Sequence, residues 1–181
     1  MQNTSVIKFE RRWSMPSKWT FTIKPIKELL EREVTGKGWI DPYAGTSKWA
    51  EVSNDLAFGG VDALEFLKQQ PSNSFDGVLL DPPYSLRQVS EHYKKAGIKI
   101  TGWHTSAGYN SALKNEASRI LKNGGKAICF GWSSMGLGKS RGFEMTEVLL
   151  VPHGGSKNDT IVTVEIKNDL HPNLQLHCLQ P

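Results

Sequence analysis

Short runs of apolar residues, each followed by turn or acidic residues, recur along the chain and predict an α/β protein. Residues 77–80 form one such run and residues 126–132 form another. Runs of this kind are typical of parallel strands that are buried on both faces. Residues 144–151 and 160–166 are apolar or alternate in polarity, and a loop rich in turn residues separates them. We therefore expect a hairpin at this end of the chain.

Apolar positions with helical spacing lie between the expected strands. One set follows residues 20–26 and ends near Gly36. A second set begins after Ser111, which we expect to cap a helix, and stops at the turn 123–125. Helices of this type cover the faces of a sheet. The two sets are Ile26, Leu29, Leu30 and Val34, and Leu113, Ala117, Ile120 and Leu121.

The tetrapeptide Asp81-Pro82-Pro83-Tyr84 directly follows the apolar run at residues 77–80. The two prolines cannot continue a strand, so the chain must turn just past its carboxyl end. In open α/β sheets, that edge is where ligands bind. The motif therefore presents a carboxylate, a rigid carbonyl and an aromatic ring at a predicted site. These groups suit a planar amine, which needs two hydrogen-bond acceptors and a stacking face.

The upstream segment Asp41-Pro42-Tyr43-Ala44-Gly45 has a similar design, in which a short apolar stretch ends in an acid, an aromatic residue and Ala-Gly. Together, the two motifs resemble those of S-adenosylmethionine-dependent amino-methyltransferases, above all the adenine-specific DNA methyltransferases. The helix, turn and strand expected after the Asp81–Tyr84 motif also match the order found in that family.

The resemblance covers residues 20–167 and implies an α/β, Rossmann-like class I methyltransferase fold. We expect a mostly parallel seven-stranded sheet with a C-terminal antiparallel hairpin. The implied organisation is a basic N-terminal arm at residues 1–19, a single methyltransferase domain at 20–167 and a tail at 168–181. A chain of 181 residues is long enough for one well-buried core.

The resemblance also implies S-adenosylmethionine as the cofactor. Asp41 would receive its ammonium group or an ordered water, and Tyr43 would give an apolar wall. The small residues Ala44 and Gly45 would let the backbone approach the methionine part. Pro42 belongs to the same motif.

The resemblance also implies a residue that accepts hydrogen bonds from the ribose hydroxyls of the cofactor. The sequence leaves Asp55 and Asn54 as alternatives for this role. The interval from Asp41 to Asp55 is shorter than the spacing of about 20 residues in a Rossmann unit. We therefore expect a clipped turn at residues 46–50 in place of the first crossover helix.

Further cofactor contacts are implied near the amino terminus and after the ribose acid. Asp62 is the expected reader of the cofactor's adenine, and it is also a favoured helix N-cap residue. A Phe-x-x-Lys-Pro segment precedes the first strand in several members of the family and closes over the cofactor. The residues that match these family positions are Ala63, which follows Asp62, and Phe21, Lys24 and Pro25 of the Phe-x-x-Lys-Pro segment.

The net charge of +4 is concentrated at the amino terminus. Basic residues interleaved with aromatics suit a phosphate backbone and unstacked bases, although a solvated arm would have the same composition. The segment 85–110, which we expect to be a loop, carries further basic residues on the substrate side. The candidate nucleic-acid contacts are Arg11, Arg12, Trp13, Lys18, Arg87, Lys94 and Lys95.

The function predicted from these residues is methyl transfer to the 6-amino group of adenine in double-stranded DNA, with the base flipped out of the helix. Asp81, Pro82, Pro83 and Tyr84 are the expected catalytic residues. Three alternatives stay open: the same chemistry on cytosine or on RNA, a non-catalytic nucleic-acid-binding subunit, and an unrelated α/β protein. The chain has no target-recognition region of obvious size, so we expect a very short site, a homodimer or a separate specificity subunit.

Cysteine and histidine positions predict neither disulfides nor a metal site. Cys129 and Cys178 lack metal-ligand spacing and suggest a reducing compartment. No apolar stretch is long enough for a membrane span. We therefore expect a cytoplasmic protein without a membrane partner.

Overall fold

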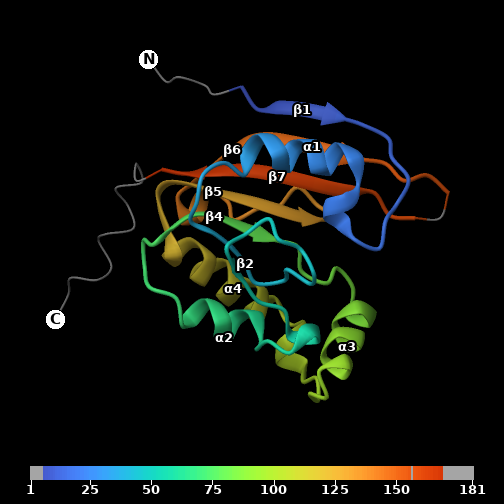
Figure 1. Cartoon of the computed structure of the whole chain (residues 1–181), viewed down its shortest axis with the longest axis vertical. Coiled ribbons are helices and arrows are strands. Elements are labelled where there is room, and N and C mark those ends of the chain that lie inside the picture. Colours follow the sequence, from blue (N-terminus) through green and yellow to red (C-terminus); the bar gives the residue numbers. More distant parts are fainter. Residues whose placement is uncertain (1–5, 156, 169–181) are drawn as a thin grey trace.

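One seven-stranded sheet organises the described part of the chain, residues 6–155 and 157–168 of a computed structural model (Figure 1). The strand order is β1-β6-β7-β5-β4-β2-β3. This arrangement confirms the predicted α/β sheet. The strands are β1 (Lys8–Arg11), β2 (Trp39–Asp41), β3 (Val52–Ser53), β4 (Phe75–Leu80), β5 (Leu121–Gly131), β6 (Phe143–Val151) and β7 (Thr160–Lys167).

Most neighbouring strands run parallel. β2 pairs in parallel with both β3 and β4, and β4 does so with β5. β7 runs antiparallel to β5 and to β6, which confirms the predicted hairpin. β1 pairs in parallel with β6 and forms an edge of the sheet. This strand lies within residues 1–19, the segment expected to be a basic arm.

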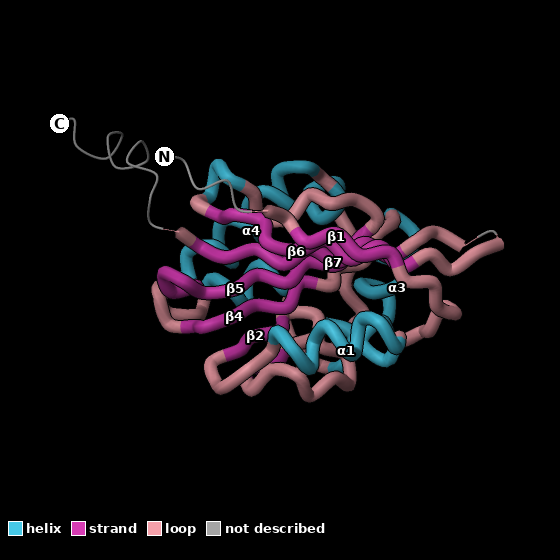
Figure 2. The backbone as a smooth tube through the Cα atoms, turned by 90° about the horizontal axis from the view of Figure 1, so that it is seen from above, coloured by secondary structure: helices cyan, strands magenta, loops and turns pink. Residues whose placement is uncertain are grey.

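Helices cover both faces of the sheet and bury two apolar layers. α1 (Lys24–Glu33) packs Ile26, Leu29 and Leu30 on one face, and α2 (Ala63–Lys68) and α4 (Ala107–Ile120) cover the other. Figure 2 shows the strands between α1 and α4. Side chains alternate along β4, so Val78 faces one layer while Leu79 faces the other. The remaining helix, α3 (Leu86–Lys95), lies beyond the end of β4.

The structure corrects the expected start and end of the last helix. α4 begins at Ala107, where Ser106 accepts a hydrogen bond from the backbone N–H of Tyr109 at 3.1 Å. Ser111 was therefore wrong as the cap, because the apolar face of the helix extends back to the buried Tyr109. The helix ends at Ile120, and residues 123–125, which were expected to form the turn that stops it, lie within β5.

The segment 85–110 is also more regular than expected. It contains α3, a short 3-10 helix at Gly102–Thr105 and the start of α4. Ser85 and Gln88 form a capping box at the start of α3. The expectation of a loop was wrong because these local caps make short helices stable.

No helix separates β2 from β3, as the short interval in the sequence predicted. The chain turns at Gly45, whose φ of 56° suits a glycine. Ser47 N–H donates to the carbonyl of Ala44 at 2.8 Å, and Ala44 N–H donates to the carbonyl of Asn54 at 2.9 Å. These bonds hold a tight turn directly over the end of β2.

The C-terminal tail expected from residue 168 onward lies, apart from Asn168, outside the described residues. Within the part of the chain that the structure describes, no helix has the length and apolar character needed to cross a membrane.

Truncating Leu79 to Ala is expected to lower the free energy of unfolding by about 2–5 kcal/mol, because this buried side chain lies in the central strand β4. The matched change Leu86→Ala, at a residue with 69% of its surface exposed, should change it by less than about 0.5 kcal/mol. Urea denaturation of both variants checks this. Equal losses would show that residue 79 is not in the core.

Candidate functional site

A cleft of about 600 Å³ opens where the parallel strands β2, β3 and β4 end. Because parallel strands end at the same edge of a sheet, the two motifs meet there, although they are separate in the sequence. The predicted residues that line the cleft are Lys18, Phe21, Tyr43, Ala44, Gly45, Asp55, Asp81, Pro82, Pro83, Tyr84 and Lys95.

Asp81 follows the last residue of β4 and is half-buried in the cleft wall. Removal from water raises its pKa to about 7, and a hydrogen bond from the Thr20 side chain partly offsets this rise. The hydroxyl of Tyr84 donates a hydrogen bond to Asp81 Oδ1. Asp81 is thus a carboxylate that titrates near neutral pH and accepts from a donor inside the cleft.

Tyr84 is held in place by the start of α3. Its backbone N–H donates to Gln88 Oε1 at 2.7 Å. The same Gln88 oxygen accepts from the backbone N–H of Ser85, the N-cap residue of α3. The Tyr84 ring faces Trp132, with ring centroids 5.8 Å apart. Trp132 directly follows β5, so the Tyr84 ring of the cleft contacts a second aromatic ring from the neighbouring strand end.

Asp41 is fully buried at the end of β2. Its Oδ1 accepts a hydrogen bond from Tyr43 N–H at 2.9 Å, but its Oδ2 has no partner. Burial raises the pKa of Asp41 well above its usual value, and the charges of Asp81 and Asp55 raise it further. A buried acceptor without a donor is uncommon in a folded protein, and Asp41, which does not line the cleft, can accept a further hydrogen bond through this oxygen.

Asp55 joins the turn after β2 to the turn after β3. Its Oδ2 accepts from Gly45 N–H at 2.9 Å, and its Oδ1 accepts from Ala57 N–H at 2.8 Å. His92 Nε2 of α3 lies 3.7 Å from Oδ1. The carboxylate therefore holds the glycine turn while it faces the cleft.

Asn54, the alternative to Asp55 as the ribose contact, does not line the cleft. Its side-chain amide exchanges hydrogen bonds with the backbone of Val61 and donates to the carbonyl of Pro42. Of the two alternatives, only Asp55 faces the cleft.

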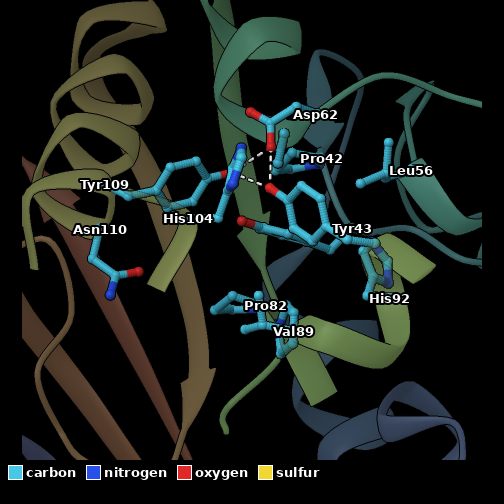
Figure 3. A pocket seen from close by; sticks show the side chains of 13 residues that line it. Pro42, Tyr43, Leu56, Asp62, Pro82, Val89, His92, His104, Tyr109 and Asn110 are labelled. Atoms are coloured by element: carbon cyan, nitrogen blue, oxygen red, sulfur yellow. Dashed lines mark hydrogen bonds between the residues drawn. The ribbon is translucent and has the colours of Figure 1, made fainter. Parts of the chain in front are cut away.

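Asp62 lies in a smaller, separate cavity of about 30 Å³ (Figure 3). Its Oδ1 accepts from Leu64 N–H at 3.0 Å, which confirms the predicted N-cap of α2. Its Oδ2 accepts from the hydroxyls of Tyr93 and Tyr109, the latter at 2.9 Å. The cavity has room for only one or two water molecules. Asp62 therefore ties α2 to α3 and α4 and does not face the large cleft.

The remaining predicted cofactor residues are divided between these two cavities and the helix start. Pro42 and Ala63 line the small cavity. Phe21 lines the large cleft and packs against Phe130 with ring centroids 4.9 Å apart. Lys24 and Pro25 form the first turn of α1 and do not line the cleft.

Two of the predicted basic residues border the cleft. Lys95 Nζ lies 3.9 Å from the centre of the Phe58 ring, and Lys18 Nζ lies 5.2 Å from the centre of the Trp19 ring. Each ammonium group is thus placed on an aromatic face at the mouth.

The other basic candidates lie elsewhere. Arg11 ends β1, and Arg12 forms an ion pair with Glu28 of α1 at 2.5 Å. Arg87 pairs with Glu91 along α3 at 2.8 Å. The exposed residues Trp13 and Lys94 do not line the cleft either.

Sequence reasoning missed three aromatic residues around the cleft. Trp19, Phe58 and Trp132 expose 42%, 49% and 45% of their surface. Their position after expected strand ends or in the basic segment could have indicated them. An exposed aromatic ring is informative only when its neighbours are known, and the sequence did not supply those neighbours.

No protein-family model and no curated protein sequence matches this chain. Solved structures with a similar fold include 1,6-didemethyltoxoflavin-N1-methyltransferase from Burkholderia thailandensis, crystallised with 1,6-didemethyltoxoflavin and S-adenosylhomocysteine. It is 12% identical, with a TM-score of 0.50, over 81% of this chain and 78% of that chain.

Two further structures have TM-scores below 0.5. TrmN from Thermus thermophilus has a TM-score of 0.49 and 18% identity over 80% of this chain, which spans only 49% of that structure. The putative methylase HI0767 from Haemophilus influenzae has a TM-score of 0.43 and 15% identity over 81% of this chain and 88% of that chain.

The strand order, the antiparallel hairpin and the similarity to the Burkholderia structure agree on the fold. The chain has a Rossmann-like methyltransferase fold. At this low identity, the similarity extends to the fold alone, and the chemistry must be argued from the cleft.

Asp81→Asn is expected to stabilise the protein relative to the wild type by more at pH 8 than at pH 5. The pKa of Asp81 is about 7 in the folded protein and about 4 in the unfolded chain. Between these values the folded wild type keeps a proton that the unfolded chain has lost, so its stability falls as the pH rises.

The side-chain amide of the Asp81→Asn variant does not titrate, so the variant does not lose stability in this way as the pH rises. Urea denaturation of both proteins at the two pH values provides the measurement. A stability difference that is the same at pH 5 and pH 8 would show that the pKa of Asp81 is not raised.

Proposed function

We propose that this protein is an S-adenosylmethionine-dependent methyltransferase that acts on the 6-amino group of adenine in DNA. The observation that carries the proposal is the meeting of the Asp81–Tyr84 motif and the turn after Asp41 in one cleft. The fold supports it, since the similar Burkholderia enzyme was crystallised with S-adenosylhomocysteine. The cleft volume of about 600 Å³ is within the usual range for small-molecule sites.

The residues that line the cleft, together with the buried Asp41 at the end of β2, fit this cofactor. The buried, unpartnered Oδ2 of Asp41 suits an ammonium group or the water that binds it. The glycine turn at Gly45 leaves its backbone open to close approach, and Asp55 offers acceptors for ribose hydroxyls. Phe58, only three residues after Asp55, offers an aromatic face to adenine. When bound, S-adenosylmethionine supplies an electrophilic methyl group on a sulfonium sulfur.

Asp81 and Pro82 are suited to hold the acceptor amine. The carboxylate of Asp81 and the carbonyl of Pro82 would accept its two N–H groups, which favours a more tetrahedral nitrogen with an available lone pair. In the present conformation the Tyr84 hydroxyl donates to Asp81, so the amine takes the place of that donor. Catalysis then depends on positioning and electrostatics, and the proton leaves after the nitrogen has been methylated.

The aromatic rings at the mouth support a nucleobase as the acceptor. Tyr84 and Trp132 present two rings on which a planar base can stack. A base in duplex DNA reaches them only after it has left the helix. Lys18 and Lys95 lie at the same opening and can contact phosphates.

Phe58→Ala is expected to weaken S-adenosylmethionine binding about tenfold or more, because stacking on an aromatic ring contributes about 1–3 kcal/mol. Asp62→Asn should change the affinity less than about threefold, since residue 62 lies outside the cleft and Asn also caps helices. Isothermal titration calorimetry compares the two variants. A large loss for Asp62→Asn alone would place adenine in the small cavity.

Transfer of labelled methyl from S-adenosylmethionine to unmethylated genomic DNA tests the proposed reaction. We expect 6-methyladenine after digestion to nucleosides, and no label with Asp81→Ala, whose cofactor affinity should stay close to that of the wild type. Leu86→Ala, an exposed change outside the cleft, is the matched active control.

Total RNA is assayed in parallel, because the same chemistry serves other amines. Label in RNA or on cytosine would retain the amino-methyltransferase and change its substrate. Cofactor binding without transfer to any nucleic acid would contradict the proposed catalysis and favour a non-catalytic subunit.

A further inference from the structure

The edge strand β1 and the two residues before it carry an unusual set of exposed apolar residues. Val6, Ile7 and Phe9 expose 91%, 47% and 65% of their surface. β1 is the terminal strand in the sheet order, and its described contacts are with β6 (Figure 1). Exposed apolar edge strands promote pairing with another chain, and monomeric proteins commonly protect them.

The register of β1 shows which of its backbone groups face outward. Arg12 N–H donates to the carbonyl of Leu150, and Ser14 N–H donates to that of Pro152. Backbone groups alternate in direction along a strand, so the even-numbered residues of β1 face β6. Ile7, Phe9 and Arg11 therefore direct their N–H and C=O groups away from the sheet.

We propose that β1 is a homodimer interface at which a second copy of this chain adds its own β1 in antiparallel orientation. The pairing is centred on Phe9, which lies opposite Phe9 of the partner subunit. The outward groups of the three odd-numbered residues then form about six hydrogen bonds across the two-fold axis. The two sheets become one continuous sheet.

The charges of β1 are complementary to themselves in this register and in no other register centred on a neighbouring residue. Centring on Phe9 places Lys8 opposite Glu10 of the partner subunit. A centre at Lys8 or Glu10 would instead place that residue opposite its own copy, so that like charges would face each other. Lys8 and Glu10 also pair with one another at 2.8 Å, which keeps both charges on one face of the strand.

Ile7 and Phe9 lie on the opposite face of β1, because side chains alternate along a strand. Phe9 is aligned with Val148 of β6. Pairing two copies would cover the exposed Phe9 rings with one another, and aromatic cross-strand pairs stabilise antiparallel sheets. Charge, hydrogen-bond direction and apolar exposure therefore specify the same partner, a second copy of this chain.

Sedimentation velocity over a range of concentrations tests the association of the full chain. We expect the wild type to be a dimer that dissociates on dilution. Phe9→Pro should be a monomer with an unchanged circular dichroism spectrum, because proline removes only an outward N–H at an edge position. A wild type that is monomeric at all concentrations, or a dimeric Phe9→Pro variant, would overturn the proposal.

Disulfide trapping tests the register independently. Phe9→Cys should form a disulfide-linked dimer on oxidation, because directly opposed residues of a hydrogen-bonded antiparallel pair have Cα atoms about 5.5 Å apart. Ile7→Cys should not, since it would face Arg11 of the partner subunit. The wild type gives the background from the native cysteines, and equal trapping of both variants would contradict this register. Neither experiment uses cofactor or methyl transfer, so the outcome is independent of the proposed function.

Discussion

The parallel alignment of β2, β4 and β5 is the constraint on which the site depends. Trp39 is paired with Gly77, and a Cβ atom at residue 77 would lie only 2.4 Å from the indole ring. The ring therefore packs directly on the glycine backbone and holds β2 against β4. Because the strands end at one edge, the turn after Asp41 and the motif that begins at Asp81 meet in one cleft.

The same arrangement places ionisable groups where they destabilise the folded chain. Burial raises the pKa of Asp41 and of Asp81, and one oxygen of Asp41 has no hydrogen-bond partner. Groups with shifted pKa values and unsatisfied acceptors are common at functional sites, and the rest of the fold must compensate for them. Here the compensation comes from two apolar layers, one on each face of the sheet.

The strands other than β1 and the two motifs could be predicted because their signals are local. The apolar runs and the prolines at Pro82 and Pro83 determine where β4 ends, whatever the rest of the chain does. The N-cap residue of α4, Ser106, was missed because the apolar face of the helix includes Tyr109. Tyr109 is buried only by contacts with distant elements. In segment 85–110, by contrast, the capping box of Ser85 and Gln88 is a local signal that the sequence contained.

The sequence by itself determined the α/β class, the closing hairpin and the position of both motifs at strand ends, since strand and turn preferences act over a few residues. Only the tertiary structure decided which acids share the cleft. Asp62 is enclosed by the hydroxyls of Tyr93 and Tyr109, whereas Asp55 faces the cleft beside Phe58. The tertiary structure also placed β1 at the edge of the sheet. These outcomes depend on contacts between residues far apart in the chain, which local patterns do not specify.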